Sequence, residues 1–233
     1  PGKMHRFDAG PPPAGRMFHG GGTSLGRRNK HEPQPNAVMG TWSVTTGVTP
    51  NIVDGMPHPF VYGRHAEPGY YIVHEASPTS AANLEWLTAQ FGGMGYAQIN
   101  ALVARLDKAA SSVQFLPFLY GSNAGLGMKS GFYGLQALHG IEHLLQAVFE
   151  GVIFSHMRHL SRLRLRFPKV ESLRVTGGPA HSAVWMQMLA DVSGLRVELP
   201  QIDETGCLGA ALCAAVGSGE FADFWQAMHG VQI

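Results

Sequence analysis

The chain has 233 residues, of which 45% are apolar and 14% are charged, which is enough apolar material for one large or two small globular domains and too little charge for a disordered protein. The formal net charge of +1 gives no electrostatic reason to expect nucleic acid or a membrane surface as a partner. Two cysteines cannot build a disulfide framework, and no apolar run approaches the roughly 20 residues of a membrane-spanning helix, so we expect a cytoplasmic protein.

Residues 1–35 differ in composition from the rest of the chain. They are rich in proline, glycine and arginine and show no apolar periodicity, which is typical of a linker or of disorder. Their abrupt change into "NAVMGTWSVTTGV" is equally consistent with an artefact, such as a misread coding segment. We therefore divide the chain into an irregular segment, 1–35, that is either disordered or artefactual, and a folded domain, 36–233.

The first part of the folded domain mixes strand and helix patterns. Short β-rich runs are predicted on both sides of Gly40-Thr41, and "GYYIVHEA" predicts a further strand. Helical spacing is present in "AANLEWLTAQF" and "YAQINALVARL". The segment "SSVQFLPFLYG" predicts a strand that enters the Gly-rich loop "NAGLGMKSGFYGL". A long helix follows at about 139–166, and Pro168 stops it.

The last third of the chain alternates between strands and helices. A strand in "ESLRVT" precedes a helix in "SAVWMQMLADVS" that Gly194 terminates, and "LRVEL" and "ETGCLGAALCAAVG" repeat the order. Short connections between such elements imply a parallel strand pair with helices packed on a face of the sheet, so the fold class is α/β, in one domain. Five side chains are expected to be buried, in the core or as small fillers: Trp185, Met186, Met188, Cys207 and Cys213.

Two glycine turns are candidate sites for an anion or a nucleotide. Gly177 and Gly178 lie between a strand and a helix N-terminus, where free backbone N–H groups favour an anion and the missing Cβ atoms let a ligand approach the backbone. Gly40-Thr41 lies between two β runs, where the hydroxyl and the neighbouring amides can donate to phosphate oxygens. The Gly177-Gly178 turn matches neither the Rossmann nor the P-loop pattern, and an ordinary tight turn is the alternative for both turns.

A third pattern, "HGIEH", matches the H-x-x-E-H motif of inverted zinc peptidases. It places His139 and His143 one helical turn apart, with Glu150 as a candidate third ligand. A glycine inside the pair and the 12 histidines of the chain favour a chance match, so we expect no metal ligands here. His156 and His159, further along the same helix, are expected on its polar side or in cap contacts.

The order of several short motifs resembles the C-terminal half of the FGGY family of carbohydrate kinases. Gly40-Thr41-Trp42 is followed by "LPFLYGSNAG", "SGFYGL", "EGV", "TGGPAHSAVWMQMLADVSG" and "ETGCLGAA". Residues 36–220 resemble that half throughout, and "NAVMGTWSVT" and "HEASPTSAANLEW" are most similar to its L-xylulose kinase branch. The resemblance implies an actin-like, ribonuclease-H-like lobe, with a mixed sheet and flanking helices, that binds ATP. A second, N-terminal lobe, missing here, would bind the sugar.

The resemblance also implies roles for single residues. The catalytic base of the family is an Asp in a G-x-x-D stretch shortly before the Gly-Thr turn, and "HRFDAG" makes Asp8 the candidate, although the stretch that follows it is longer and differs from the helix of the family. In "GSNAG", many relatives carry charged residues in place of Ser122 and Asn123. The interdomain hinge matches at Glu204 and Gly209. Seven positions match the ATP-binding segments: Gly40 and Thr41 for phosphate, and Gly177, Gly178, Ala180, Ser182 and Gln187 for adenosine.

The function implied by the resemblance is ATP-dependent phosphorylation of a sugar hydroxyl, on a pentulose or related carbohydrate similar to L-xylulose. Such a reaction needs Mg²⁺ on the phosphates, amides that hold them, and a base for the hydroxyl proton. This lobe alone is expected to be inactive, and a homodimer is left open. The alternative is a non-catalytic actin-like module that binds a nucleotide or a partner chain, and a zinc hydrolase comes third.

Overall fold

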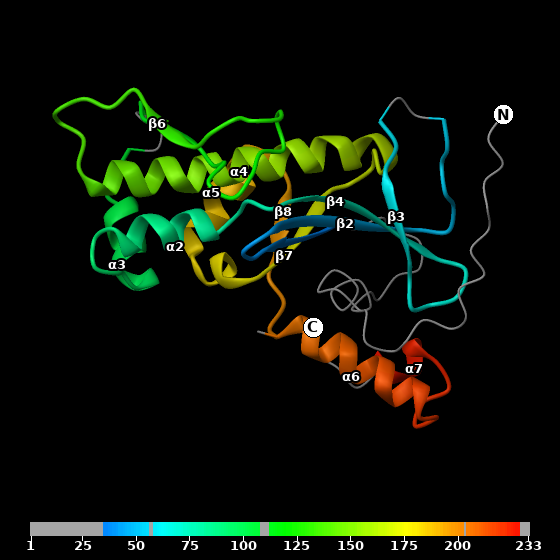
Figure 1. The fold of residues 1–233 in the computed structure, drawn as a ribbon. Helices are drawn as coiled ribbons and strands as arrows, with labels where there is room; N and C mark the ends of the chain where they lie inside the picture. Colours follow the sequence, from blue (N-terminus) through cyan, green and yellow to red (C-terminus); the bar gives the residue numbers. More distant parts are fainter. Residues whose placement is uncertain (1–34, 56–57, 108–111, 203, 229–233) are drawn as a thin grey trace.

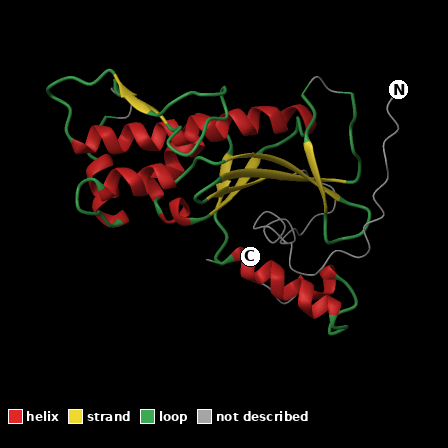
Figure 2. Ribbon diagram, in the orientation of Figure 1, coloured by secondary structure: helices red, strands yellow, loops and turns green. Residues whose placement is uncertain are grey.

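The computed structural model describes residues 35–55, 58–107, 112–202 and 204–228. Their main feature is a six-stranded mixed sheet with the order β3-β4-β2-β1-β7-β8 (Figures 1 and 2). Its strands are β1 (Asn36–Met39), β2 (Ser43–Thr49), β3 (Val61–Arg64), β4 (Tyr71–Ser77), β7 (Ser172–Thr176) and β8 (Arg196–Glu198). A separate two-stranded sheet pairs β5 (Gln114–Leu116) with β6 (Gly131–Tyr133). The helices are α2 (Ala82–Ala89), α3 (Tyr96–Val103), α4 (Ile141–Arg166), α5 (Ala183–Ser193), α6 (Thr205–Gly217) and α7 (Phe224–Met228), with a 3-10 turn η2 (Gly178–His181).

The large sheet is antiparallel on one side of β1 and parallel on the other, so β1 marks a switch point in strand pairing. Strands β3, β4, β2 and β1 pair antiparallel, whereas β1 pairs with β7 and β7 with β8 in parallel. In the parallel pair, Val38 lies opposite Thr176, so β1 and β7 end at the same edge of the sheet. The β1–β2 turn, which contains Gly40-Thr41, and the turn into η2, which contains Gly177-Gly178, therefore emerge side by side. Such switch points are common places for ligands in open α/β sheets.

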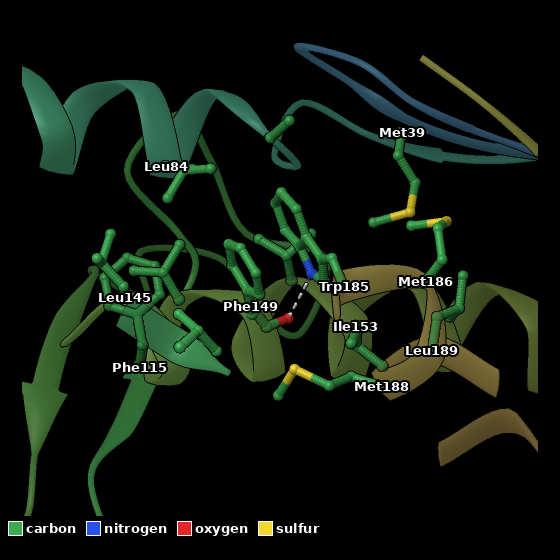
Figure 3. Close-up of a cluster of buried hydrophobic side chains, with 14 of the residues drawn as sticks. Met39, Leu84, Phe115, Leu145, Phe149, Ile153, Trp185, Met186, Met188 and Leu189 are labelled. Atoms are coloured by element: carbon green, nitrogen blue, oxygen red, sulfur yellow. Dashed lines mark hydrogen bonds between the residues drawn. The ribbon is translucent and has the colours of Figure 1, made fainter. Parts of the chain in front are cut away.

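Helix α4 lies across one face of the sheet, and α2, α3 and α5 lie alongside it (Figure 1). The main core forms here, and Figure 3 shows its centre, where Trp185 stacks on Phe149 with ring centroids 4.1 Å apart. The indole N–H donates to the Phe149 carbonyl at 3.1 Å. Trp185, Met186 and Met188 are buried, as predicted, and α4 ends two residues before Pro168.

Helices α6 and α7 lie on the opposite side of the sheet from α4 (Figure 1). They pack on each other around Leu212 and Ala227. This small cluster leaves Cys207 exposed and Cys213 only half-buried, so the expectation that both cysteines are buried fillers is wrong. None of the described helices combines the length and the apolar character that crossing a bilayer requires.

Candidate functional site

The two predicted glycine turns open onto one cavity of about 880 Å³. It lies at the switch point of the sheet, between the sheet and the start of α6. Its lining residues come from the β1–β2 turn, four strands, the turn into η2, and the start of α6: Val38, Gly40, Thr41, Trp42, Val44, His74, Ala76, Thr176, Gly177, Gly178, His181, Glu204, Thr205 and Gly206. Five predicted site residues, Gly40, Thr41, Gly177, Gly178 and Glu204, thus share one cavity, whose volume is in the range of small-molecule and cofactor sites.

The floor of the cavity is a row of strand residues on the sheet face opposite α4. Thr176, Val38, Val44 and Ala76 lie next to one another across four strands, because Val38 pairs with both Thr176 and Val44, and Val44 pairs with Ala76. His74 lies two residues before Ala76 on β4 and so faces the same way. The floor is therefore mostly apolar, and sequence reasoning missed it. The alternation in "YIVHEA" places His74 and Ala76 on one face, but only the pairing of the strands shows what that face lines.

Gly177 is required by the fold itself. Its φ of 101° and ψ of 173° lie in a region that only glycine occupies readily. A Cβ at this position would lie 2.4 Å from the Met39 carbonyl oxygen. The missing side chain therefore lets the turn into η2 contact the backbone at the end of β1, which brings the two turns together.

Gly40 and Gly178 differ from Gly177, because neither has a positive φ. A Cβ on Gly40 would make only ordinary contacts, at 3.9 Å and beyond, and one on Gly178 would meet the Tyr96 hydroxyl at 3.2 Å. The backbone would thus accept alanine at Gly40, and also at Gly178 after a small shift of Tyr96. Since both residues line the cavity, their missing side chains leave room for a ligand there, and they are not needed to avoid a backbone clash.

The β1–β2 turn is held from both sides. The Gly40 N–H donates to the Trp42 carbonyl at 3.2 Å, and the Ala81 N–H, just before α2, donates to the Gly40 carbonyl at 3.0 Å. Thr41 and Trp42 are exposed at the tip of the turn and line the cavity. The turn therefore presents a fixed backbone together with one hydroxyl and one aromatic ring.

The charges around the cavity are few. Among the described lining residues there is no Lys or Arg, and Glu204 is the one carboxylate. Burial lowers the pKa of His74, so its ring is neutral near neutral pH. His181 lies exposed at the end of η2. Among these residues, a bound phosphate would therefore meet backbone amides and the Thr41 hydroxyl rather than a Lys or Arg side chain.

Four further predicted site residues that the structure describes do not line this cavity. Ser182 is fully buried as the N-cap of α5, where its hydroxyl accepts from the Trp185 N–H at 3.1 Å and donates to the Asn100 side chain. Gln187 is exposed and donates to Asp191 at 2.7 Å. Ala180 lies inside η2 and Gly209 is buried within α6. Asp8 falls outside the described residues.

The "HGIEH" histidines take part in the start of α4. His143 Nδ1 accepts from the Gly140 N–H at 3.0 Å, which caps the helix. His139 Nδ1 accepts from a backbone N–H of the preceding turn at 2.9 Å, and its Nε2 lies 3.0 Å from a serine hydroxyl. Glu150 accepts a hydrogen bond from a glutamine one turn before it. In the part of the chain that the structure describes, no three His, Cys, Asp or Glu side chains are placed to hold a metal ion.

Comparison with known proteins decides the family. Residues 36–218 match the family model described as the C-terminal domain of the FGGY family of carbohydrate kinases. The chain belongs to this family. The chain is 59% identical over 224 residues to the L-xylulose/3-keto-L-gulonate kinase of Escherichia coli (strain K12), covering 96% of this chain and 45% of that protein. It is 57% identical over 219 residues to the probable L-xylulose kinase of Pasteurella multocida (strain Pm70), covering 94% and 45%. The chain thus spans less than half the length of these curated relatives.

Solved structures show the same fold. The chain superposes on a xyloylose kinase from Brucella ovis with a TM-score of 0.76 at 22% identity, covering 89% of this chain and 43% of that one. The xylulose kinase from Rhodospirillum rubrum gives a TM-score of 0.74 at 22% identity, covering 92% and 45%. The predicted α/β class is confirmed as an actin-like, ribonuclease-H-like lobe with a mixed sheet and flanking helices.

Proposed function

We propose that this chain is the ATP-binding lobe of a kinase that transfers the γ-phosphoryl group of ATP to a hydroxyl of a sugar. Membership of the FGGY family supports the reaction class. The two L-xylulose kinases at 57–59% identity support a pentulose such as L-xylulose, or a related keto-sugar, as the substrate. One observation carries the assignment of the site: the Gly40-Thr41 turn and the Gly177-Gly178 turn, far apart in sequence, open onto the same cavity.

The residues around the cavity fit an adenine nucleotide. In one turn, the backbone and the Thr41 hydroxyl of the β1–β2 turn provide hydrogen-bond donors for phosphate oxygens. In the adjacent turn, Gly178 leaves the backbone bare, so that adenosine can lie against it. The apolar floor of the cavity, formed by Val38, Val44 and Ala76, provides a contact surface for a ring. Mg²⁺, when bound with the nucleotide, would supply the positive charge that the described lining residues lack.

The remaining parts of the reaction belong to other segments. A sugar would bind in the N-terminal lobe that the longer relatives contain, and closure of the two lobes would exclude water and bring the hydroxyl to the phosphate. The base is an aspartate, with Asp8 as the candidate from the sequence. Catalysis by this chain alone is therefore expected to be very weak or absent, and its location in the cytoplasm and its assembly as a homodimer remain proposals.

The experiment that tests this proposal is calorimetric titration of the folded chain with Mg-ATP and Mg-ADP, with Mg-GTP as a control. We expect both adenine nucleotides to bind, and GTP to bind more weakly. If the chain is folded by circular dichroism and takes up no adenine nucleotide, the assignment of the cavity is contradicted. A version that carries both lobes would then be assayed for ADP formation that depends on the sugar. A kinase forms ADP in this assay, whereas a non-catalytic nucleotide-binding module binds ATP but forms no ADP.

A further inference from the structure

Helix α4 buries a polar stripe against the sheet. His156 and His159 are each only 3% exposed, so the expectation that they lie on the outer, polar side of the helix is wrong. The reason lies in the sheet, because β2 and β4 present Ser43, Glu75 and Ser77 on the face that α4 covers. The histidines therefore find hydrogen-bond partners inside the protein.

His156 is the centre of this stripe. Its Nδ1 lies 3.1 Å from the Ser43 hydroxyl, and its Nε2 lies 3.0 Å from the Ser80 hydroxyl. Ser43 and Ser80 are fully buried. A neutral imidazole has one donor and one acceptor nitrogen, so one serine donates to the ring and the other accepts from it. The ring therefore fixes both hydroxyls.

The two serines belong to the two segments that hold the Gly40–Trp42 turn. Ser43 directly follows Trp42 and begins β2. Ser80 directly precedes Ala81, whose N–H donates to the Gly40 carbonyl at 3.0 Å. His156 thus lies beneath the turn and connects the strand that leaves it to the segment that supports it. His156 does not line the large cavity itself, so it acts on that cavity through the turn.

The surrounding network holds this arrangement in place. Ser77, the cross-strand partner of Ser43, lies with its hydroxyl 3.1 Å from His159 Nε2. Burial raises the pKa of Glu75, but hydrogen bonds from His159 and Arg162 outweigh it and leave that pKa lowered, so the carboxylate stays charged. Arg162 Nε lies 2.9 Å from this carboxylate. The polar stripe is therefore anchored at its far end by an ion pair.

We propose that His156 is a positioning residue for nucleotide binding, which keeps the Gly40–Trp42 turn in the geometry that receives the phosphates. The inference rests on the proposed function of that turn. It differs from a purely structural role in one measurable respect. Loss of a positioning residue weakens the binding of phosphate-bearing ligands, whereas loss of a merely structural residue affects every ligand of the cavity alike.

The test uses variants of the whole chain, titrated with Mg-ATP and, by competition, with adenosine. His156→Ala removes both hydrogen bonds and is expected to lower the affinity for Mg-ATP on the order of tenfold, the equivalent of one or two hydrogen bonds, and that for adenosine less than about twofold. His156→Asn and His156→Gln place an amide near the positions of Nδ1 and Nε2, so each is expected to restore part of the loss. Ser80→Ala leaves the imidazole ring in place, so its affinity for Mg-ATP is expected to lie between those of the two amide variants and that of the wild type.

Leu160→Ala is the matched control, because Leu160 is buried one turn further along α4 and has no polar contact to lose. It is expected to destabilise the fold without changing the ratio of the two affinities. Equal losses for Mg-ATP and adenosine in His156→Ala, or an unchanged affinity for Mg-ATP in a folded variant, would overturn the inference alone. A wild-type chain that binds neither ligand would overturn the proposed function, and the inference with it.

Discussion

Gly177 and Gly178 are neighbours, but the structure predicts opposite consequences when each is replaced. In Gly177→Ala the new Cβ would lie 2.4 Å from the carbonyl oxygen and 2.8 Å from the carbonyl carbon of Met39, and backbone atoms cannot rotate away. The φ of 101° adds a conformational cost of about 1–3 kcal/mol, and overpacking adds about 1–3 kcal/mol. We expect Gly177→Ala to lose about 2–6 kcal/mol of unfolding free energy, a large share of the stability of an ordinary domain.

Gly178→Ala meets only the far end of the Tyr96 side chain, at 3.2 Å, on an exposed residue without a positive φ. We expect it to change stability by less than about 1 kcal/mol, as most surface substitutions do. Its side chain would instead enter the space where adenosine is proposed to lie. Gly178→Val is therefore expected to fold and to bind Mg-ATP at least about tenfold more weakly than the wild type.

Urea unfolding followed by circular dichroism measures the first effect, and calorimetry measures the second. Gly69→Ala is the matched control, because Gly69 has a φ of +84° but nothing within 4 Å of its Cβ position, so alanine there carries the cost of a positive φ without the clash. The clash argument is refuted if Gly177→Ala unfolds at the same urea concentration as Gly69→Ala with an unchanged slope. An unchanged affinity for Mg-ATP in folded Gly178→Val refutes the proposed adenosine contact.

Three further predictions follow from buried polar groups. Ser182→Ala loses the cap of α5 and the hydrogen bond to Asn100, so we expect the free energy of unfolding in urea to fall by about 1–2 kcal/mol. A large loss of Mg-ATP affinity without that destabilisation would instead favour a direct role for Ser182 in binding. Burial, and to a smaller extent the positive charge of His159, lowers the pKa of His156 from 6.5 to about 3. As the pH falls below 6.5, this histidine therefore takes up a proton in the unfolded chain but not in the folded one. The free energy of unfolding should fall by about 2 kcal/mol between pH 7 and pH 5, and His156→Gln should remove most of this fall. If the free energies of unfolding of the variant and the wild type fall in parallel over this range, the lowered pKa of His156 is contradicted. Trp185→Phe removes the N–H that donates to Phe149 and should cost about 1–2 kcal/mol in urea unfolding, with near-wild-type stability as the contrary result.

The sequence predicted those elements whose pattern is long or regular. The helix α4 and the alternation from β7 to α6 appear with nearly their predicted bounds, because a long apolar stripe and a strand–helix–strand order leave few alternatives. The strands β3 and β6 were missed. Each has only three or four residues and contains a glycine, and each forms a strand because a partner, β4 or β5, supplies its hydrogen bonds. Such tertiary pairing leaves little trace in the local sequence.

The candidate site likewise has parts that the sequence predicted and parts that only the tertiary structure shows. The two turns were predicted because glycines between regular elements are visible in a sequence, and the order of the motifs indicated which turns belong together. The floor of the cavity and the contacts of His156 depend on which strands pair and which face a helix covers. Ser182 and Gln187 were placed at the site by resemblance, whereas the capping geometry of α5 directs one into the core and the other to solvent.

The glycines of the two turns suggest how a residue that serves the fold can be told from one that serves a ligand. Gly177 has no room for a side chain, so its presence is fully explained by the contact with Met39, and it says nothing by itself about binding. Gly40 and Gly178 have room for one, and both line the cavity. A glycine costs conformational entropy on folding, roughly 0.5–1 kcal/mol relative to alanine where the backbone is ordinary. If Gly40→Ala and Gly178→Ala both stabilise the chain and both weaken Mg-ATP binding, then these positions carry a stability cost that only a ligand explains; an alanine that stabilises without weakening binding would remove that residue from the site.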